Sequence, residues 1–307
     1  MITLLERLHG SLLGLATGDA VGTTLEFTLP QKVIPIDDMV GGGPFKLKPG
    51  QWTDDTSMAL CLAHSLIESN DFNPKDQLDK YVRWYQEGYM SSTGKCFDIG
   101  QTIYRALLSY RRTGDHYWNA TNPRMAGNGS IMRLAPVPMF YHGDAAEAVR
   151  FSGQSSRTTH PLQVTIDACE YFGGLIWGAL NGTDKETLLS DHWSPVNGYW
   201  QSRTEVPELE QVLSGSFKSK EPPEIQGTGY VVRSLEAALW AFYKSTNFKD
   251  GLLLGVNLGG DADTTGAIYG QIAGAFYGVK SIPPSWKEKL AMRELMENIS
   301  SQMEDVL

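Results

Sequence analysis

Two short stretches of the sequence each carry closely spaced aspartates beside threonine, where a polar loop gives way to an apolar segment. These residues are Thr53, Asp54 and Asp55 in the first stretch and Asp261, Asp263 and Thr264 in the second. Aspartate or threonine at the start of a helix accepts hydrogen bonds from the free N–H groups of the first turn, and the helix dipole favours its negative charge. One aspartate satisfies that role, so the second in each stretch needs another explanation.

A divalent cation supplies that explanation, because neighbouring carboxylates repel each other unless a positive charge lies between them. Mg²⁺ and Mn²⁺ prefer oxygen ligands, which carboxylates and hydroxyls provide. For one stretch alone, capping and metal binding are both open. Two such stretches in one chain favour metal binding, and four carboxylates that meet in space suit a pair of Mg²⁺ or Mn²⁺ ions.

Other metal and diphosphate chemistries fit the sequence less well. The six histidines are scattered and form no HxxxH pair, which argues against a zinc site. An isoprenoid synthase is expected to carry DDxxD, whereas Asp54 and Asp55 are followed by Thr-Ser-Met. No histidine directly precedes an aspartate, which argues against an HD-type phosphohydrolase.

Three further features have both a functional and a structural interpretation. Glu26 lies between two apolar residues, where burial would raise its pKa as a general acid or base requires, but it could equally face solvent. The segment 127–130, Gly-Asn-Gly-Ser, can approach a phosphate closely or form an ordinary turn. His160, which precedes a proline, suits a helix cap or a pocket.

The elements that would position these residues are helical. Apolar residues recur at helical spacing and alternating strand patterns are scarce, which predicts an all-α fold. The expected helices span residues 4–16, 57–68, 98–110, 145–151, 163–181, 230–244 and 265–278. Asp98 and Gln101, at the start of the third, resemble a capping box. Loops are expected at 37–52, 112–130 and 191–228.

The proline-containing stretch 191–228 could be a linker between two domains. However, its flanking segments do not differ in composition, and helix 230–244 needs a partner to bury its apolar face. We therefore expect a single domain over residues 1–307, with 191–228 as a loop-rich excursion.

The composition narrows the class of protein. The net charge of −9 over 307 residues argues against a broad nucleic-acid-binding surface. Three cysteines without a CxxC pair, and an N-terminal segment unlike a signal peptide, lead us to expect a cytoplasmic protein. The apolar run 264–279 has a glycine at every fourth position, as membrane helix dimers do. Its 16 residues fall short of the roughly 20 that span a bilayer, so we expect a helix buried in a core.

Together, seven motifs resemble the ADP-ribosylglycohydrolase family. They are GDAVGTTLEF (18–27), WTDDTSMAL (52–60), CFDIGQT (96–102), GNGSIMR (127–133), THP (159–161), GYVVRSLEAALWAF (229–242) and GGDADTTGAIYGQIAGAFYG (259–278), in the family's order along nearly the whole chain. The sequence looks closest to the bacterial branch typified by the dinitrogenase reductase-activating glycohydrolase. This resemblance implies a compact, orthogonal multi-helix fold with two Mg²⁺ or Mn²⁺ ions in a cleft.

The resemblance also implies roles for individual residues. Metal ligands would be Thr53, Asp54, Asp55, Asp261, Asp263 and Thr264. Catalytic residues would be Glu26, Asp98 and Asp55, and substrate-binding residues would be Gly127, Asn128, Gly129, Ser130, His160 and Tyr230.

The resemblance implies an enzyme that removes ADP-ribose from a modified protein. The expected linkage is an α-linked bond to an arginine side chain. The expected partners are an ADP-ribosylated protein and the product ADP-ribose, with no nucleic acid and no membrane span. Hydrolysis of another linkage (serine or a small ADP-ribose metabolite) and a non-catalytic ADP-ribose-binding protein are the alternatives. The intact set of acids argues against a pure binder, since a binder could lose a ligand without penalty.

Overall fold

The computed structural model describes residues 2–201 and 207–306. In this part of the chain the regular elements are helices, and β-structure is reduced to isolated bridges, so the predicted all-α fold is confirmed. The helices of the first half are α1 Leu4–Gly22, α2 Asp54–Ser69, α3 Pro74–Glu87, α4 Gln101–Thr113, α5 Pro136–Phe140 and α6 Ala145–Arg157. They are followed by α7 Gln163–Leu180, α8 Lys185–Leu188, α9 Pro207–Leu213, α10 Val231–Lys244, α11 Phe248–Val256, α12 Ala262–Tyr277, α13 Pro284–Lys289 and α14 Arg293–Glu304.

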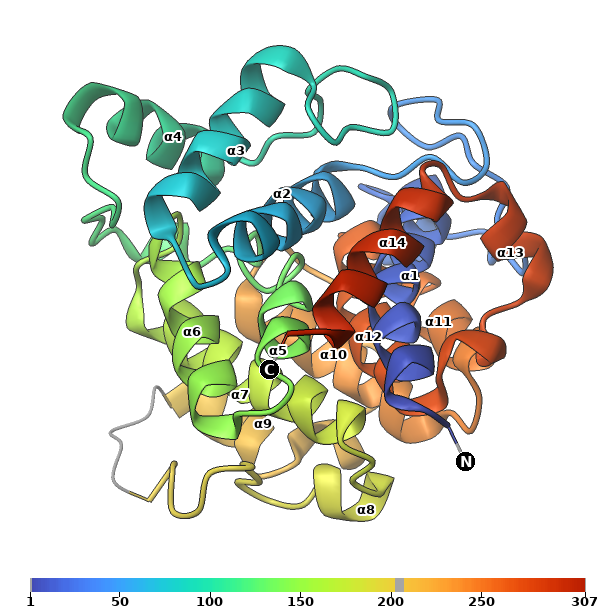
Figure 1. Cartoon of the computed structure of the whole chain (residues 1–307). Coiled ribbons are helices and arrows are strands. Elements are labelled where there is room, and N and C mark those ends of the chain that lie inside the picture. The colour runs from blue at the N-terminus through green and yellow to red at the C-terminus, as the bar shows by residue number, and fades with distance from the viewer. Residues whose placement is uncertain (1, 202–206, 307) are drawn as a thin grey trace.

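The centre of the molecule is an antiparallel pair, α1 and α12, from opposite ends of the chain (Figure 1). Their glycines face each other in register. A Cβ atom at Gly14 would lie 2.2 Å from the carbonyl oxygen of Gly270, and one at Gly18 would lie 2.0 Å from that of Gly266. Only residues without a side chain allow backbones to approach this closely. The regular glycines of segment 264–279 therefore serve the contact between these two helices.

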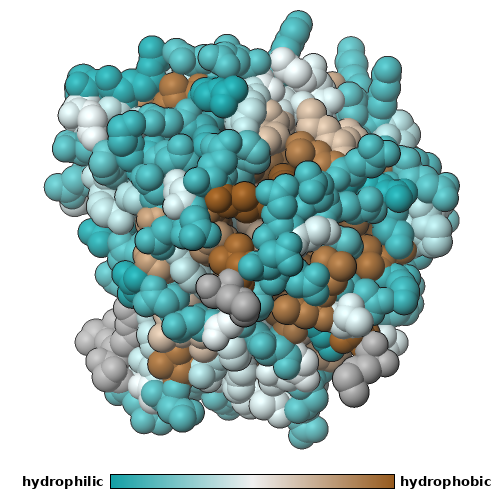
Figure 2. All heavy atoms as spheres, in the orientation of Figure 1, coloured by the Kyte–Doolittle hydropathy of each residue, from teal (hydrophilic) through white to brown (hydrophobic). Residues whose placement is uncertain are grey.

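Most of the remaining helices pack around this pair. Helix α14 contacts α1, while α7, α10 and α11 contact α12. Helices α2, α3 and α4 contact one another in succession and lie together at the top of Figure 1. Hydrophilic side chains cover most of the face drawn in Figure 2, with apolar side chains visible between them toward its middle. None of the helices in the described ranges is long and apolar enough to cross a membrane.

Several helix boundaries differ from the expected ones. Helix α2 begins at Asp54 rather than at 57, and α12 at Ala262 rather than at 265, so the first turns contain the acidic motifs. Helix α4 begins at Gln101, with Gly100 at the N-cap and no capping side chain, so the proposed capping box at Asp98 is wrong. The reason is its backbone: Asp98 has a φ of 59°, which is outside helical geometry.

Unpredicted helices account for other differences. The expected loop 191–228 contains α9, and residues outside the predicted helices form α3, α5, α8, α11, α13 and α14. A local signal was available for α3, because Asn73 caps it by accepting from the Asp76 N–H group and Pro74 is its first residue.

Candidate active site

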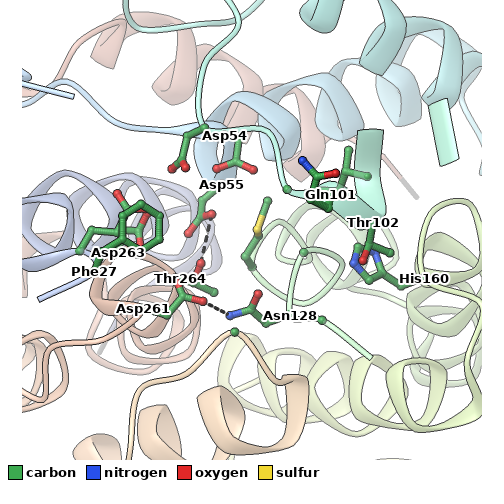
Figure 3. Close-up of a pocket in the computed structure, with 18 of the residues that line it drawn as sticks. Phe27, Asp54, Asp55, Gln101, Thr102, Asn128, His160, Asp261, Asp263 and Thr264 are labelled. Atoms are coloured by element: carbon green, nitrogen blue, oxygen red, sulfur yellow. Dashed lines mark hydrogen bonds between the residues drawn. The ribbon is translucent and has the colours of Figure 1, made fainter. Parts of the chain in front are cut away.

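The helix ends that carry the acidic motifs surround a cavity of about 300 Å³ (Figure 3). One end is lined by carboxylates from several distant parts of the chain: Glu26, Asp54, Asp55, Asp98, Asp261 and Asp263. The glycine-rich loop 127–129, the first turn of α4 and His160 line the other end. Of the described residues that line the cavity, Arg124 alone carries a positive charge. The cavity is therefore acidic at one end and lined by a glycine-rich loop and the start of a helix at the other.

One hydrogen bond and one close approach join the first acidic motif to the second. The Thr264 hydroxyl donates to Asp55 Oδ1 at 3.4 Å, and the Thr53 hydroxyl lies 3.4 Å from Asp263 Oδ2. The structure thus brings together residues that are about two hundred positions apart, as four carboxylates that share cations require.

The acids do not cap their helices, so the capping interpretation of both motifs is wrong. At α2 the capping acceptor is Asp19 of α1: its Oδ1 accepts from the Thr53 N–H group at 2.9 Å, and its Oδ2 accepts from the Thr56 N–H group at 3.0 Å. At α12, Asp261 occupies the N-cap position but accepts instead from the Asn128 side-chain amide, at 2.7 Å. Asp54, Asp55 and Asp263 are left to face the cavity.

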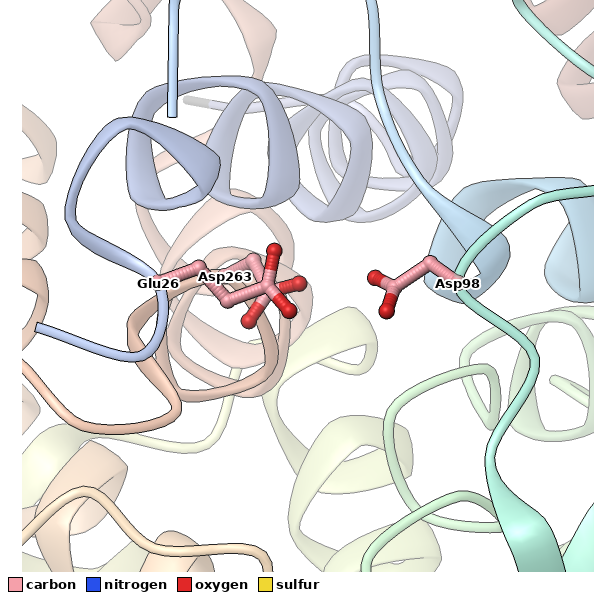
Figure 4. A group of neighbouring side chains, drawn as sticks. All are labelled: Glu26, Asp98 and Asp263. Atoms are coloured by element: carbon pink, nitrogen blue, oxygen red, sulfur yellow. The ribbon is translucent and has the colours of Figure 1, made fainter. Parts of the chain in front are cut away.

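Buried oxygens without hydrogen-bond partners gather at this end of the cavity. In the described part of the chain, Glu26 Oε2, Asp55 Oδ2 and Asp263 Oδ1 are buried and accept no hydrogen bond. One oxygen each from Glu26, Asp98 and Asp263 lies within 4.8 Å of the other two (Figure 4). Unpaired buried carboxylate oxygens are costly, and a divalent cation is the group that satisfies several of them at once. The residues present therefore fit a metal.

The electrostatics of the acidic end agree with this fit. Burial, reinforced by Asp98 and other neighbouring acids, raises the pKa of Glu26 to about 9. Burial and the repulsion of nearby carboxylates raise the pKa of Asp98 to about 7 and the pKa values of Asp54, Asp55 and Asp263 well above their usual range. A cation would offset this repulsion and favour the ionised, metal-binding form of each acid.

At the opposite end of the cavity the glycine loop packs closely on His160. A Cβ atom at Gly129 would lie 2.8 Å from His160 Cε1, so the loop must approach the imidazole without a side chain there. The first turn of α4 lines the same space, with no side chain capping its N–H groups. Such N–H groups and the helix dipole suit an anion such as a diphosphate.

Three of the candidate residues lie outside the cavity lining. The Ser130 hydroxyl is buried against Ser156 and Cys169. Tyr230 is half-buried at the N-cap of α10, and its backbone forms a bridge with Gly127. Thr53 is fully buried behind the acids, where its hydroxyl is 2.9 Å from Asp19.

Sequence reasoning also missed lining and supporting residues. Asp19, in the Gly-Asp-Ala stretch of α1, supports the first acidic motif, and Phe27, Gln101, Thr102 and Arg124 line the cavity. Asp19 had a signal, because it is the one acidic or basic residue in the largely apolar stretch 10–25. Arg124 had none, since only the fold places its turn near α4.

Fold and site define a class of protein: an all-helical fold in which a carboxylate cluster and a glycine-rich loop line one cavity. A model of the family described as ADP-ribosylglycohydrolase matches residues 1–307. The chain is 42% identical to "ADP-ribosylarginine hydrolase Tri1" of Serratia proteamaculans (strain 568), over 97% of this chain and 79% of that protein. It is 33% identical to "ADP-ribosyl-[dinitrogen reductase] glycohydrolase" of Rhodospirillum rubrum, over 94% of this chain and 91% of that protein.

A solved structure, "ADP-ribosylglycohydrolase-related protein complex", aligns with a TM-score of 0.86 and 41% identity, over 99% of this chain and 98% of that one. The chain therefore belongs to the ADP-ribosylglycohydrolase family, a family of hydrolytic enzymes, and it has the family's fold. The resemblance inferred from the seven motifs is confirmed.

Proposed function

We propose that this protein is a metal-dependent hydrolase that removes ADP-ribose from arginine side chains of a modified protein. The observation that carries the proposal is the shared cavity, in which six carboxylates face a glycine loop and a helix N-terminus. The first group suits cations and sugar hydroxyls, and the second suits a diphosphate. A relative whose name specifies ADP-ribosylarginine supports arginine as the acceptor, and a second, whose name specifies ADP-ribosyl-[dinitrogen reductase], supports a modified protein as the substrate.

The acidic end would hold two divalent cations, Mg²⁺ or Mn²⁺. Their proposed ligands are Thr53, Asp54, Asp55, Asp261, Asp263 and Thr264, with Glu26 beside them. When bound, such ions supply positive charge that orients the vicinal ribose hydroxyls and polarises the sugar.

Proton transfer would be carried out by the acids themselves. Hydrolysis at the anomeric carbon needs one group that takes a proton from water and another that protonates the departing guanidine nitrogen. Glu26, Asp98 and Asp55 are the candidates, since all three line the cavity at its acidic end. Neighbouring acids with different pKa values suit a division of labour between base and acid.

The rest of the ADP-ribosyl group would lie along the opposite wall. Gly127, Asn128, Gly129 and His160 line that wall directly, and Ser130 and Tyr230 would support it from behind. Arg124 adds a positive charge to the cavity lining, which suits the diphosphate.

Phe27 provides the observation that bears on the acceptor. Its side chain lines the cavity next to the acids yet remains 66% exposed, on a backbone with a φ of 58°. An exposed aromatic ring beside carboxylates is a good surface for a guanidinium group, which stacks on aromatic faces. A serine hydroxyl offers no such interaction. Phe27 therefore supports an arginine linkage over a serine linkage.

The proposal includes a cytoplasmic location, an ADP-ribosylated protein as substrate and ADP-ribose as product, without a nucleic-acid partner. The test is release of ADP-ribose from a protein modified on arginine, measured by chromatography with EDTA, Mg²⁺ or Mn²⁺. We expect release that requires a divalent cation. A serine-linked peptide and a small ADP-ribosyl metabolite, assayed in parallel, test the other linkages. If nothing is released from the arginine-linked protein with either metal, the proposal is wrong.

A further inference from the structure

Arg133 is a fully buried cation that bonds to the glycine loop of the cavity and to the residue that precedes His160. Its guanidinium carbon lies 4.7 Å from the centre of the Tyr81 ring. Nη1 donates to the Gly129 carbonyl at 2.8 Å, and Nη2 donates to the Thr159 hydroxyl at 2.7 Å. Burial of a guanidinium group is costly unless its donors find acceptors. The same cation therefore fixes both the glycine loop and the segment that carries His160.

The Thr159 hydroxyl connects this cation to the imidazole. Arginine only donates hydrogen bonds, so Thr159 Oγ1 accepts from Arg133. The hydroxyl is fully buried and needs an acceptor for its own proton. Among the described residues that acceptor is His160 Nδ1, at 2.9 Å. A nitrogen that accepts a hydrogen bond carries no proton, so Nδ1 is the unprotonated atom of the ring.

The proton of the neutral imidazole is then on Nε2. Burial, with a smaller contribution from the positive charge of Arg133, lowers the pKa of His160 to about 3, which keeps the ring neutral at physiological pH. The main chain of His160 is fixed because its carbonyl accepts from the Ser156 hydroxyl at 2.9 Å and the Thr165 hydroxyl at 2.7 Å. In the described ranges Nε2 forms no hydrogen bond within the protein, and the ring lines the cavity (Figure 3).

We propose that Arg133 and Thr159 are positioning residues that hold His160 in the Nε2–H tautomer, so that the imidazole offers a neutral N–H donor to an oxygen of the ADP-ribosyl group. The opposite tautomer would leave the Thr159 hydroxyl without an acceptor and would present a lone pair to the phosphate and sugar oxygens of the ligand. The choice of ligand rests on the proposed function, whereas the tautomer does not.

The tautomer is measured directly by long-range ¹H–¹⁵N correlation spectra of the histidine-labelled full chain. The His160 signals are assigned by their loss in His160→Gln. We expect a pyridine-like Nδ1 and a pyrrole-like Nε2 from pH 6 to 9. A wild-type ring protonated on Nδ1, or one that titrates in this range, would overturn the proposal.

Three variants test the chain of hydrogen bonds. Thr159→Val removes the hydroxyl at nearly constant volume, so His160 should lose its single tautomer. Thr159→Ser keeps the hydroxyl and should keep the Nε2–H tautomer. Thr158→Val is the matched control, since its hydroxyl lies 3.5 Å from the same Nη2 atom but does not touch the imidazole. A tautomer unchanged in Thr159→Val, with melting temperature confirming a folded protein, would refute the relay.

Binding of ADP-ribose in the presence of Mg²⁺ completes the test. Loss of one oriented donor should weaken Kd about tenfold in Thr159→Val and leave Thr159→Ser and Thr158→Val near wild type. An unchanged Kd in Thr159→Val would show that the donor is not used. If wild type shows the Nε2–H tautomer but binds no ADP-ribose, the relay stands and the proposed function fails, so the two outcomes are distinguishable.

Discussion

The chemistry of the acidic end of the cavity depends on individual carboxylate oxygens that lack hydrogen-bond partners in the protein. Asp263 is 2% exposed and its Oδ1 accepts no hydrogen bond among the described residues. Asparagine has the same shape without the charge, so Asp263→Asn removes a proposed cation ligand and also one repelling carboxylate. We expect release of ADP-ribose to fall by about 100-fold or more, while the melting temperature in EDTA rises.

Chromatographic assay of ADP-ribose release and thermal melts in EDTA check both effects. Asp191→Asn is the control, because this exposed acid pairs with Lys218 away from the cavity and should change neither quantity. An Asp263→Asn protein with full activity would refute the metal-ligand assignment. A lower melting temperature in EDTA would instead show that the carboxylate stabilises the metal-free fold.

The proposed stacking of the acceptor arginine on Phe27 can be tested independently of the metal site. Replacement of the ring by leucine keeps an apolar side chain but removes the face on which a guanidinium group can stack. We expect Phe27→Leu to raise KM for an arginine-linked protein several-fold with little change in kcat. Ile34→Ala, at a site 82% exposed and outside the cavity lining, should leave KM unchanged. Equal KM values for wild type and Phe27→Leu would remove the observation that favours arginine.

The sequence motifs predicted many of the residues that line the site, but not the contacts or the backbone geometry of those residues. The sequence identified the acids and their neighbours as chemically active. It could not show that Asp19 would displace Asp54 as the capping acceptor, because that contact joins residues 34 to 37 positions apart. The capping box that the sequence predicted at Asp98 is absent, because the left-handed backbone of this residue is outside helical geometry.

The start of helix α2 depends on a hydrogen-bond acceptor from α1, which is Asp19. Replacement of Asp19 therefore tests this contact. The two oxygens of Asp19 accept from the N–H and hydroxyl groups of both Thr53 and Thr56, all within 3.0 Å, in a fully buried setting. In Asp19→Asn, an NH2 group replaces one of the two oxygens. This donor would then face other N–H and O–H donors. We expect a loss of about 2–3 kcal/mol in the free energy of unfolding, measured by urea denaturation, and weaker metal binding.

The control for this variant is Asp144→Asn. Asp144 caps α6 by accepting from the N–H groups of Ala146 and Glu147, where asparagine caps equally well. Its stability should stay close to wild type. If Asp19→Asn were as stable as Asp144→Asn, the support of α2 by α1 would be refuted.

The helix pair α1 and α12 sets the position of the site, since Asp19 lies in one helix and Asp263 in the other. An added methyl group at Gly14 would clash with the Gly270 carbonyl and force the helices apart. We expect Gly14→Ala to destabilise the protein by about 1–3 kcal/mol or more and to weaken metal binding. Gly143→Ala, where a Cβ would meet no atom within 4 Å, should be neutral in both measurements. A stable, fully metal-binding Gly14→Ala protein would contradict the close approach.

For the whole molecule, the periodicity of the sequence predicted the fold class but not which helices would pair. Helix α12 shares its glycine spacing with membrane helix dimers, and the sequence predicted a buried helix there, but not its partner, which lies about 250 residues earlier. Since the first helix packs on one near the C-terminus, neither half of the chain holds a complete core. We therefore propose that residues 1–307 are a single domain, which predicts one calorimetric unfolding transition with equal calorimetric and van't Hoff enthalpies.

The acidic cluster also sets how stability depends on pH. The pKa of Glu26 is about 9 in the folded chain and near 4.5 when unfolded, so between these values the metal-free folded protein retains a proton that the unfolded chain has lost. The free energy of unfolding must then decrease as pH rises from 5 to 9. Cations bind the ionised acids, so stabilisation by Mg²⁺ should grow over the same range. Melting temperatures in EDTA and in Mg²⁺ measure both slopes, and Glu26→Gln should flatten the EDTA slope. A metal-free melting temperature that rises toward pH 9 would show that the acids are not held close together in solution.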